Sequence, residues 1–394
     1  MTEPARTSWP AVLLAVGAGV TAAFQIGKAP IALPFIRAEI HIGLSAASWI
    51  LSIFALLGAT AGASMGSVVT RLGARRMLPI GLLLLSAASL AGGLAPDLPW
   101  LLTSRAVEGV GYMLVVISAP ALITLLTHPD DRQTAFGMWG SFMPFGVAVA
   151  MMAAPGLPLL GWRGLWLSMA VLLAGYALLI HRRMPHPVLP ASISPGHLLH
   201  DIARTIKAPA PLLLAILFIP YSAGYAALTG FLPTLLIERM ALSPGTAGML
   251  AAAVAAANIL GNLASGPLLR RGLPRWAAMA AASTVIALTS LGIFAPSMPA
   301  GMAYALCLIF SAVGGLLPGC ILGGAAIFAP ERRLVPVTLG LLMQGSNVGQ
   351  LVGPVAVGAA VVAFGWEGAR LVLVPASLSG IALALALRRM GKAS

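Results

Sequence analysis

The segment WPAVLLAVGAGVTAAFQIGKAPIALPFI (residues 9–36) decides the class of fold. It exceeds the roughly 20 apolar residues that a helix needs to cross a bilayer, and Lys28 is its only charged residue. Similar runs recur along the whole chain of 394 residues, which is 59% hydrophobic and 8% charged. A soluble protein of this length would need far more charge to cover its surface. The sequence therefore predicts an all-α membrane protein.

Hydropathy predicts twelve membrane-spanning helices. They are expected at residues 10–36, 45–69, 77–95, 99–126, 134–159, 164–181, 211–236, 246–268, 275–294, 299–328, 335–363 and 369–387. The first is too long for the apolar part of a signal peptide and has no clear cleavage site, so we expect it to stay as an uncleaved span.

The loops that join these spans differ in charge between the two sides of the membrane. With both termini on the cytoplasmic side, the outer loops hold only Arg37, Arg163, Arg239 and Arg370. The basic residues on the cytoplasmic side are Arg6, Arg71, Arg75, Arg76, Arg132, Arg182, Arg183, Arg204, Lys207, Arg270, Arg271, Arg275, Arg332, Arg333, Arg388, Arg389 and Lys392. By the positive-inside rule, we expect a multi-pass protein of the cell inner membrane with both termini in the cytoplasm. This bias, and not nucleic-acid binding, explains the net charge of +13.

A long polar loop divides the spans into six and six. Pro185, Pro187, Pro190 and Pro195 exclude a continuous helix, while GHLLHDIARTIK (196–207) has the pattern of a short basic amphipathic helix. Two histidines in this stretch lack the carboxylate or thiolate cluster of a metal site, so we expect a solvated linker and no metal. We predict an N-terminal six-helix bundle (1–181), a cytoplasmic linker (182–210) and a C-terminal six-helix bundle (211–394).

The two halves repeat short motifs at matching places. GWRGLW (161–166) follows the fifth span, and GWEGAR (365–370) follows the eleventh. GSVVTRLGARR (66–76) joins spans two and three, and GPLLRRGLPR (266–275) joins spans eight and nine. This spacing indicates a duplicated six-helix unit. In transporters built from such repeats, the substrate site lies between the repeats near the midplane of the bilayer.

The loop between spans two and three resembles a signature of the major facilitator superfamily, and the resemblance to this family covers essentially the whole chain. Thr70 stands where the family usually has an acidic residue, a departure that bears on the charge lock by which this loop holds one conformational state. The resemblance implies a twelve-helix fold of two bundles and a gating role for the matching residues, which are Gly66, Arg71, Gly73, Arg75 and Arg76.

Two further stretches resemble signatures of the same family. SRAVEGVGY (104–112) matches one of them through Arg105, which is implicated in coupling in proton-coupled members, and has Glu108 where glutamine is common. GQLVGPVAVG (349–358) resembles a glycine-rich signature of exporters, although its small residues also suit close helix packing. QIGKAPIALPFIRAEI (25–40) resembles, more loosely, the branch of cyanate and nitrate-type anion carriers.

Lys28 is the candidate substrate-binding residue that the sequence singles out. A lysine at the centre of a span costs roughly 2.5–3.5 kcal/mol, so something must compensate for it. Either its side chain reaches toward the outer headgroups, or it faces a water-filled cavity between the bundles together with Gln25 on the same helical face. In a cavity, the two side chains would suit a carboxylate or a small inorganic anion.

Arg105 and Glu108 lie three residues apart in the fourth span, so their side chains can pair. Two roles are open: the pair holds the helix in place, or Glu108 exchanges a proton while Arg105 engages the substrate. In the second half, where interhelical bonding is the alternative role, the candidate substrate contacts are Tyr221, Tyr225, Gln344 and Asn347.

The sequence predicts a secondary active transporter and no enzyme. It contains no hydrolytic triad, metal-ligand set or phosphate-binding Gly-x-x-x-x-Gly-Lys-Ser/Thr loop, so we expect no catalytic residue, no cofactor and no ATP-driven transport. The expected partners are a small anionic or polar solute, protons or another coupling ion, and the bilayer, with symport by a monomer. The alternatives are proton-driven multidrug efflux and a membrane receptor that transports nothing.

Overall fold

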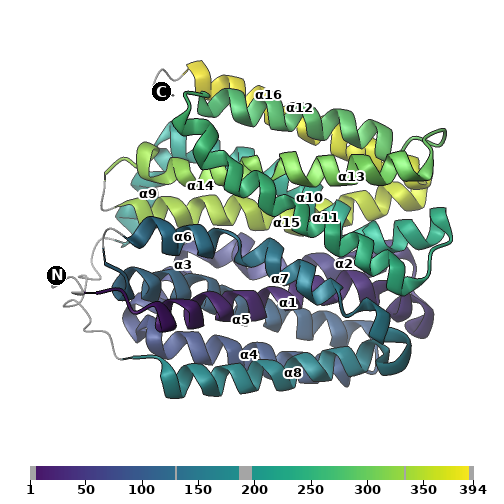
Figure 1. Cartoon of the computed structure of the whole chain (residues 1–394), viewed down its shortest axis with the longest axis horizontal. Helices are drawn as coiled ribbons and strands as arrows, with labels where there is room; N and C mark the ends of the chain where they lie inside the picture. Colours follow the sequence, from purple (N-terminus) through teal and green to yellow (C-terminus); the bar gives the residue numbers. More distant parts are fainter. Residues whose placement is uncertain (1–5, 129–130, 186–197, 332–333, 390–394) are drawn as a thin grey trace.

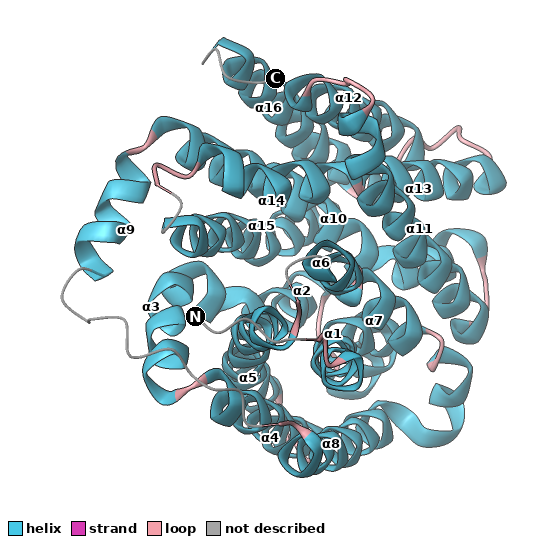
Figure 2. Ribbon diagram, turned by 60° about the vertical axis from the view of Figure 1, so that its left-hand side comes forward, coloured by secondary structure: helices cyan, strands magenta, loops and turns pink. Residues whose placement is uncertain are grey.

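The computed structural model describes residues 6–128, 131–185, 198–331 and 334–389, and within these ranges the regular elements are helices (Figure 1, Figure 2). The all-α fold predicted from the sequence is confirmed. The helices are α1 (Trp9–Ile40), α2 (Leu44–Ser52), α3 (Leu56–Leu72), α4 (Ala74–Gly93), α5 (Leu98–Leu126), α6 (Arg132–Gly140), α7 (Phe142–Met151), α8 (Leu157–Arg183), α9 (Leu198–Lys207), α10 (Pro209–Met240), α11 (Pro244–Arg270), α12 (Arg275–Ile293), α13 (Ala300–Gly314), α14 (Leu316–Phe328), α15 (Val335–Phe364) and α16 (Ala369–Arg389).

Eleven continuous helical runs in the described residues are long and apolar enough to cross a membrane. One of them, Phe142–Arg183, makes parts of two passes because the chain reverses direction within it (Figure 1). The reversal falls at Gly161, whose φ of 64° lies in the left-handed region that glycine adopts without strain. With this run divided, the described helices make the twelve passes that hydropathy predicts.

Three of the passes are interrupted by a short break. The second consists of α2 and α3 joined by the 3-10 turn η1 (Ile53–Ala55), the fifth of α6 and α7, and the tenth of α13 and α14. Gly140 and Ser141 lie at one break, and Gly314 and Gly315 lie at another. Small residues of this kind permit a helix to bend, and the bends explain why these passes are not single helices.

The passes form two groups that lie side by side (Figure 1). Most helices of α1 to α8 pack on one another, and α10 to α16 do the same. The large contacts between the groups are those of α2 and α3 with α15 and of α7 with α11. α1 begins and α16 ends at the same end of the molecule, called the terminal end below, and the opposite end is called the distal end (Figure 1). The two groups correspond to the two halves of the sequence.

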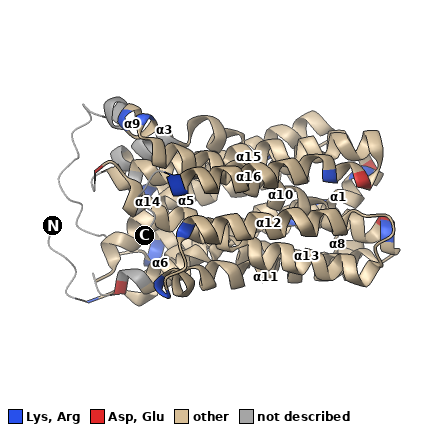
Figure 3. Cartoon of the chain, turned by 90° about the horizontal axis from the view of Figure 1, so that it is seen from above, with Lys and Arg blue, Asp and Glu red and all other residues tan. Residues whose placement is uncertain are grey.

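The predicted amphipathic helix is confirmed as α9, which lies at the terminal end and contacts α10 and α15. Residues 186–197 of the predicted linker, including His197, lie outside the described residues. Lys and Arg residues are concentrated toward the terminal end, as Figure 3 shows. The basic residues described at the distal end are Arg37, Arg163, Arg239 and Arg370.

The glycines of the eleventh pass let α15 lie directly against α10. A Cβ atom at Gly349 would overlap the backbone around Ile219, and one at Gly353 would overlap the backbone of Ala223. Backbones approach this closely only where one partner has no side chain. The exporter-like motif therefore has a packing role in this structure.

Gly353→Ala should lower the free energy of unfolding by about 1–3 kcal/mol, because the added methyl group has no space against Ala223. Gly340 is a matched control on the same helix, since no atom lies within 4 Å of a Cβ built there. Gly340→Ala should be neutral, or stabilising by up to about 1 kcal/mol through helix propensity. Thermal unfolding of the purified variants measures both effects, and equal melting temperatures would contradict the packing role.

Candidate transport site

Three charged side chains meet inside the first half. Nζ of Lys28 on α1 lies 2.7 Å from Oε1 of Glu108 on α5, and Nη1 of Arg105 lies 2.5 Å from Oε2 of the same carboxylate. None of the three side chains is more than 1% exposed. The predicted pairing of Arg105 with Glu108 is confirmed, and Lys28 is a third member that the sequence did not connect to it. We call these three residues the charge cluster.

The ammonium group of Lys28 is enclosed by α4 and α8. Nζ also donates to Oγ of Ser89 at 2.7 Å, and Ser89 donates to the carbonyl of Trp166 at 2.9 Å. The ring of Trp166 lies 4.3 Å from Nζ, close enough for a cation–π contact. A carboxylate, a hydroxyl and an aromatic ring thus replace the water that the ammonium group loses on burial.

The guanidinium group of Arg105 joins α5 to α1 and α2. Nε donates to the carbonyl of Ile50 at 3.1 Å, and Nη1 donates to the carbonyl of Gln25 at 2.7 Å. Its carbon lies 4.7 Å from the ring centroid of Phe54 in η1, which in turn contacts α15 of the second half. Arg105 is therefore the member of the charge cluster that lies toward the other half.

The side chain of Gln25 is fully buried beside this cluster. Neither its Nε2 nor its Oε1 has a hydrogen-bond partner in the part of the chain that the structure describes. Leaving a buried polar group without a partner costs about 1–3 kcal/mol. The buried amide of Gln25, which has no such partner in the described structure, is therefore a place where a polar ligand could bind.

Lys28 does not face the second half, so the prediction that it lines a cavity between the bundles is wrong. Arg37, nine residues further along α1, reaches Glu238 on α10, with 3.0 Å between Nη1 and Oε1. Lys28 instead contacts Ser89, Glu108 and Trp166, so Lys28 and Arg37 have their partners in different halves. The alternative, a side chain that reaches the headgroups, is also wrong, because Nζ is bonded inside the first half.

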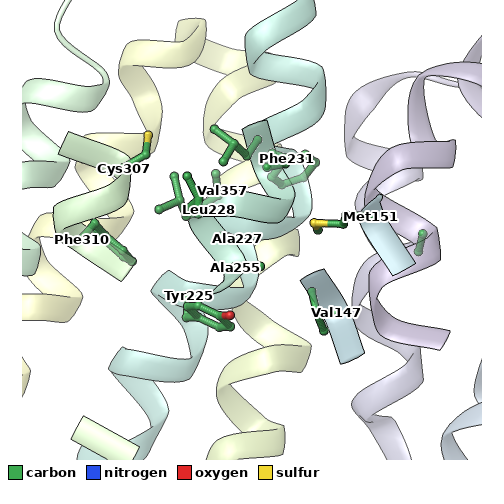
Figure 4. Packing of buried hydrophobic residues seen from close by; sticks show 14 of the residues in the cluster. Val147, Met151, Tyr225, Ala227, Leu228, Phe231, Ala255, Cys307, Phe310 and Val357 are labelled. Atoms are coloured by element: carbon green, nitrogen blue, oxygen red, sulfur yellow. The ribbon is translucent and has the colours of Figure 1, made fainter. Parts of the chain in front are cut away.

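The two candidate tyrosines lie on α10 with their rings stacked, 5.9 Å between centroids. Nδ2 of Asn258 donates to the hydroxyl of Tyr221 at 3.0 Å, which places Tyr221 in the interior of the second half. The hydroxyl of Tyr225 has no partner among the described residues. In Figure 4 it points to the side of α10 on which Val147 of α7 lies. Of the pair, Tyr225 is the one that offers a hydroxyl toward the first half.

Gln344 and Asn347 lie on α15 where it meets α3. Nε2 of Gln344 donates to the carbonyl of Ala59 at 2.9 Å, across the boundary between the halves. Nδ2 of Asn347 donates to the carbonyl of Met343 at 2.8 Å, and its side chain adjoins Gly58 of the first half. The structure thus places both predicted residues between the halves, where Gln344 also holds them together.

The predicted gating residues lie in and around the turn between α3 and α4: Gly73 forms the turn, Gly66 and Arg71 belong to α3, and Arg75 and Arg76 belong to α4. Gly73 has a φ of 86°, in the left-handed region, and Nε of Arg75 donates to the carbonyl of Met184 at 3.2 Å. This bond fixes the turn to the end of α8, whereas Arg76 is exposed. Gly66, Thr70 and Arg71 are among the residues of this motif whose burial and side-chain contacts lie outside the described structure.

A repeated contact lies at the distal end of each half. In the first, Nε1 of Trp162 donates to Oε2 of Glu39 at 2.6 Å; in the second, Nε1 of Trp366 donates to Oε2 of Glu238 at 3.0 Å. Both tryptophans come from the repeated Gly-Trp motifs. Sequence reasoning missed the carboxylates, although each lies near the end of the first helix of its half. Since Glu238 also holds Arg37, this contact joins the two halves.

Two groups of helices, in contact along α3 and α15 and at the distal end, make this a multi-pass helical membrane protein built from two halves. Residues 14–335 match the Major Facilitator Superfamily, and the chain belongs to this family.

Curated relatives include proteins with different cargoes. The puromycin resistance protein pur8 of Streptomyces alboniger is 35% identical over 135 residues, which cover 34% of this chain and 27% of that protein. The galactose-proton symporter of Escherichia coli is 28% identical over 169 residues, covering 42% of this chain and 36% of the symporter. The multidrug efflux pump LfrA of Mycolicibacterium smegmatis is 31% identical over 119 residues, covering 30% of this chain and 24% of the pump. The matched regions thus span about a quarter to a third of the length of these relatives.

A solved structure shares the fold over nearly the full length. It is the crystal structure of a bacterial homolog of the human lysosomal transporter Spinster in an inward-facing and occupied conformation, with a TM-score of 0.77 and 17% identity over 96% of both chains. At this identity the likeness establishes the fold alone.

Glu108→Gln should lower the free energy of unfolding by about 3–5 kcal/mol, because it leaves two buried cations without a carboxylate. Lys28→Met should be milder, since Glu108 keeps Arg105 as its partner. The double variant Lys28→Met/Glu108→Gln should be more stable than Glu108→Gln alone, because only one buried cation remains. Thermal unfolding of the purified proteins measures this cycle.

Glu39→Gln is the control for this series, because its carboxylate is 48% exposed and its ion pair with Arg163 contributes at most about 1 kcal/mol. If the double variant unfolds at the same temperature as Glu108→Gln, a buried Lys28 without its carboxylate does not destabilise the protein. The proposed energetics of the charge cluster would then be wrong.

Proposed function

We propose that this protein is a carrier that moves a small anionic or polar organic solute across the inner membrane by alternating access, in symport with protons. The observation that carries the proposal is the charge cluster, in which one carboxylate is shared by two buried cations. The looser resemblance to cyanate and nitrate-type anion carriers points to the same substrate class. The terminal end would face the cytoplasm, and a monomer would suffice.

Glu108 is the proton-coupling residue in this proposal. The other acidic side chains that the structure describes lie near helix ends or in loops, and Glu108 is the buried one. Ionisable groups inside a membrane protein typically mark ion or proton pathways. A proton on Glu108 would release Lys28 and Arg105 from their shared partner and leave both cations uncompensated.

An anionic substrate would balance that charge. The cluster has a formal charge of +1 when Glu108 is ionised and +2 when it is protonated. A monovalent anion that binds together with the proton returns the total to +1. Arg105 is the cation placed to receive it, because its guanidinium lies against η1 on the side of α15. Lys28 then acts through Glu108 and does not touch the substrate itself.

The polar groups of the second half would complete the site. Tyr225 presents a hydroxyl without a partner in the described structure, while Gln344 and Asn347 lie between the halves. The buried amide of Gln25 supplies a further donor and acceptor beside Arg105. These groups can bind an organic solute through hydrogen bonds without adding charge.

Alternating access requires that the contacts of the distal end break once in each cycle. The ion pair of Arg37 and Glu238 joins the halves there, and its side chains are 26% and 43% exposed. Exposed ion pairs of this kind contribute roughly 0–1 kcal/mol of stability, so this pair can form when the distal end is closed and break at little cost when it opens. A closed distal end fits the inward-facing state of the similar Spinster homolog structure.

Proton-driven efflux of apolar drugs is the second candidate function. Two of the relatives described above, a puromycin resistance protein and a multidrug efflux pump, support it. In that case Glu108 would still couple protons, but Arg105 would hold α1, α2 and α5 together and would not contact cargo.

The coupling role is tested with the protein in liposomes under an imposed pH gradient, using a solute found to exchange in counterflow. Lys28→Met keeps the Glu108–Arg105 pair and should remain driven by the gradient. Lys28→Met/Glu108→Gln has the same formal cluster charge as the ionised wild type but no proton site. It should still exchange solute, yet no longer accumulate it in response to the gradient, and accumulation that persists would exclude Glu108 as the coupling residue.

The substrate class is tested by thermal stabilisation, because a ligand that binds the folded state raises its melting temperature. Small carboxylates and inorganic anions form one set of probes, and lipophilic cationic drugs form the other. We expect anions to stabilise the wild type and to have no effect on Arg105→Gln. Stabilisation by the drugs alone would overturn the anion proposal in favour of efflux.

A further inference from the structure

The second half contains a cavity of about 290 Å³ that is separate from the charge cluster. It lies at the distal end between α10, α12 and α13 and adjoins the loop that joins α12 to α13. Its volume is close to the lower limit for small-molecule sites, roughly 300 Å³. The lining includes Leu235, Leu236 and Cys307, which are at most 5% exposed, and Tyr304.

One charged residue lines this cavity. Arg239 is exposed at the distal end of α10, where the cavity meets the loop, and no carboxylate is among the lining residues. Its Nη1 donates to the carbonyl of Ile293 at 2.9 Å, and its Nη2 donates to the carbonyl of Ala295 at 3.0 Å. These bonds hold the guanidinium at the mouth and use two of its five N–H groups, so donors remain for a ligand.

Arg239 differs from the other arginines of the distal end. Arg37 pairs with Glu238 at 3.0 Å, Arg163 with Glu39 at 2.9 Å and Arg370 with Glu367 at 2.7 Å. Within the described residues, Arg239 has no carboxylate partner.

In the first half, an arginine binds the carbonyls at a helix end and still has a carboxylate partner. There Arg163 bonds the carbonyls of Gly93 and Ala95 at the end of α4 while it also pairs with Glu39. The same structural task in the second half leaves a positive charge at the mouth of a cavity whose buried lining includes Leu235, Leu236 and Cys307. A ligand that complements both features has an anionic head and a hydrocarbon body.

We propose that this cavity binds a single-chain anionic amphiphile, such as a medium-chain fatty acid. The carboxylate would bind Arg239 at the distal membrane surface, and the chain would lie among Leu235, Leu236 and Cys307. The volume admits one short chain and excludes a two-chain lipid. This site does not depend on the proposed transport function, because it shares no residue with the charge cluster.

Cys307 reports on occupancy because it lines the cavity as a buried thiol. In the Cys320→Ser background it is the single cysteine of the chain. The full-length protein in nanodiscs of zwitterionic lipid is treated with methyl methanethiosulfonate, and the rate of modification is followed by mass spectrometry. Decanoate should slow the reaction, whereas decanol, with the same chain and no charge, and acetate, with the head alone, should slow it far less.

Arg239→Gln should weaken the protection by decanoate at least about tenfold, as expected for the loss of a charge-assisted hydrogen bond. Arg370→Gln is the matched control in the same half, because that arginine has its own carboxylate, and it should leave protection unchanged. Ala303→Phe, which fills the cavity, should slow the modification of Cys307 without decanoate.

A second readout keeps the test independent of thiol chemistry. Decanoate should raise the melting temperature of the wild type, but not that of Arg239→Gln or Ala303→Phe. The proposal is overturned if decanoate and decanol protect Cys307 equally, or if Arg239→Gln keeps full protection. It is also overturned if Cys307 reacts at the same rate with and without decanoate, or does not react in either case.

Discussion

The carboxylate of Glu108, held between Lys28 and Arg105, is the interaction on which the rest of the structure depends. Buried charged side chains need polar partners, and the partners in this cluster belong to several helices. Glu108 and Arg105 come from α5, Lys28 from α1, and the carbonyls and hydroxyl that complete the cluster from α1, α2 and α4. The cluster therefore fixes the rotation of α1 about its axis. Lys28 is committed to the interior of the first half, and α1 meets α10 through Arg37 instead.

Those features of the fold that depend on local pattern could be predicted from the sequence. Apolar runs locate the passes, the Leu and Ile spacing locates α9, and a separation of three residues on one helix brings Arg105 to Glu108. The contact of Lys28 with Glu108 joins residues 80 positions apart and depends on how α1 is rotated, which hydropathy does not contain. The Trp162–Glu39 and Trp366–Glu238 contacts were missed for the same reason, although the Gly-Trp repeat marked one partner of each.

The position of Lys28 changes how the anion hypothesis must be understood. A lysine facing a cavity could bind the substrate directly. A buried Lys28 instead stabilises the ionised form of the Glu108 carboxylate that it binds. In the proposed mechanism, function depends on the charge balance among these three groups, and the anionic substrate adds a fourth charge. The polar residues of the second half fit a different role, since Gln344 binds backbone across the boundary and Asn347 lies beside it. In the proposed cycle they would bind a solute when the halves move apart, which would link recognition to the conformational change. The cavity beside Arg239 shares no residue with the charge cluster and lies at the distal end of the second half.

The protonation state of Glu108 is the quantity on which this account stands. Infrared difference spectroscopy follows it directly through the carboxyl C=O stretch, recorded as pH is lowered with and without a transported solute. The account predicts a band that appears in the pH range where a proton gradient drives transport, strengthens when the solute is bound, and is missing from Lys28→Met/Glu108→Gln. A carboxylate that stays ionised throughout that range, with solute bound, would contradict it.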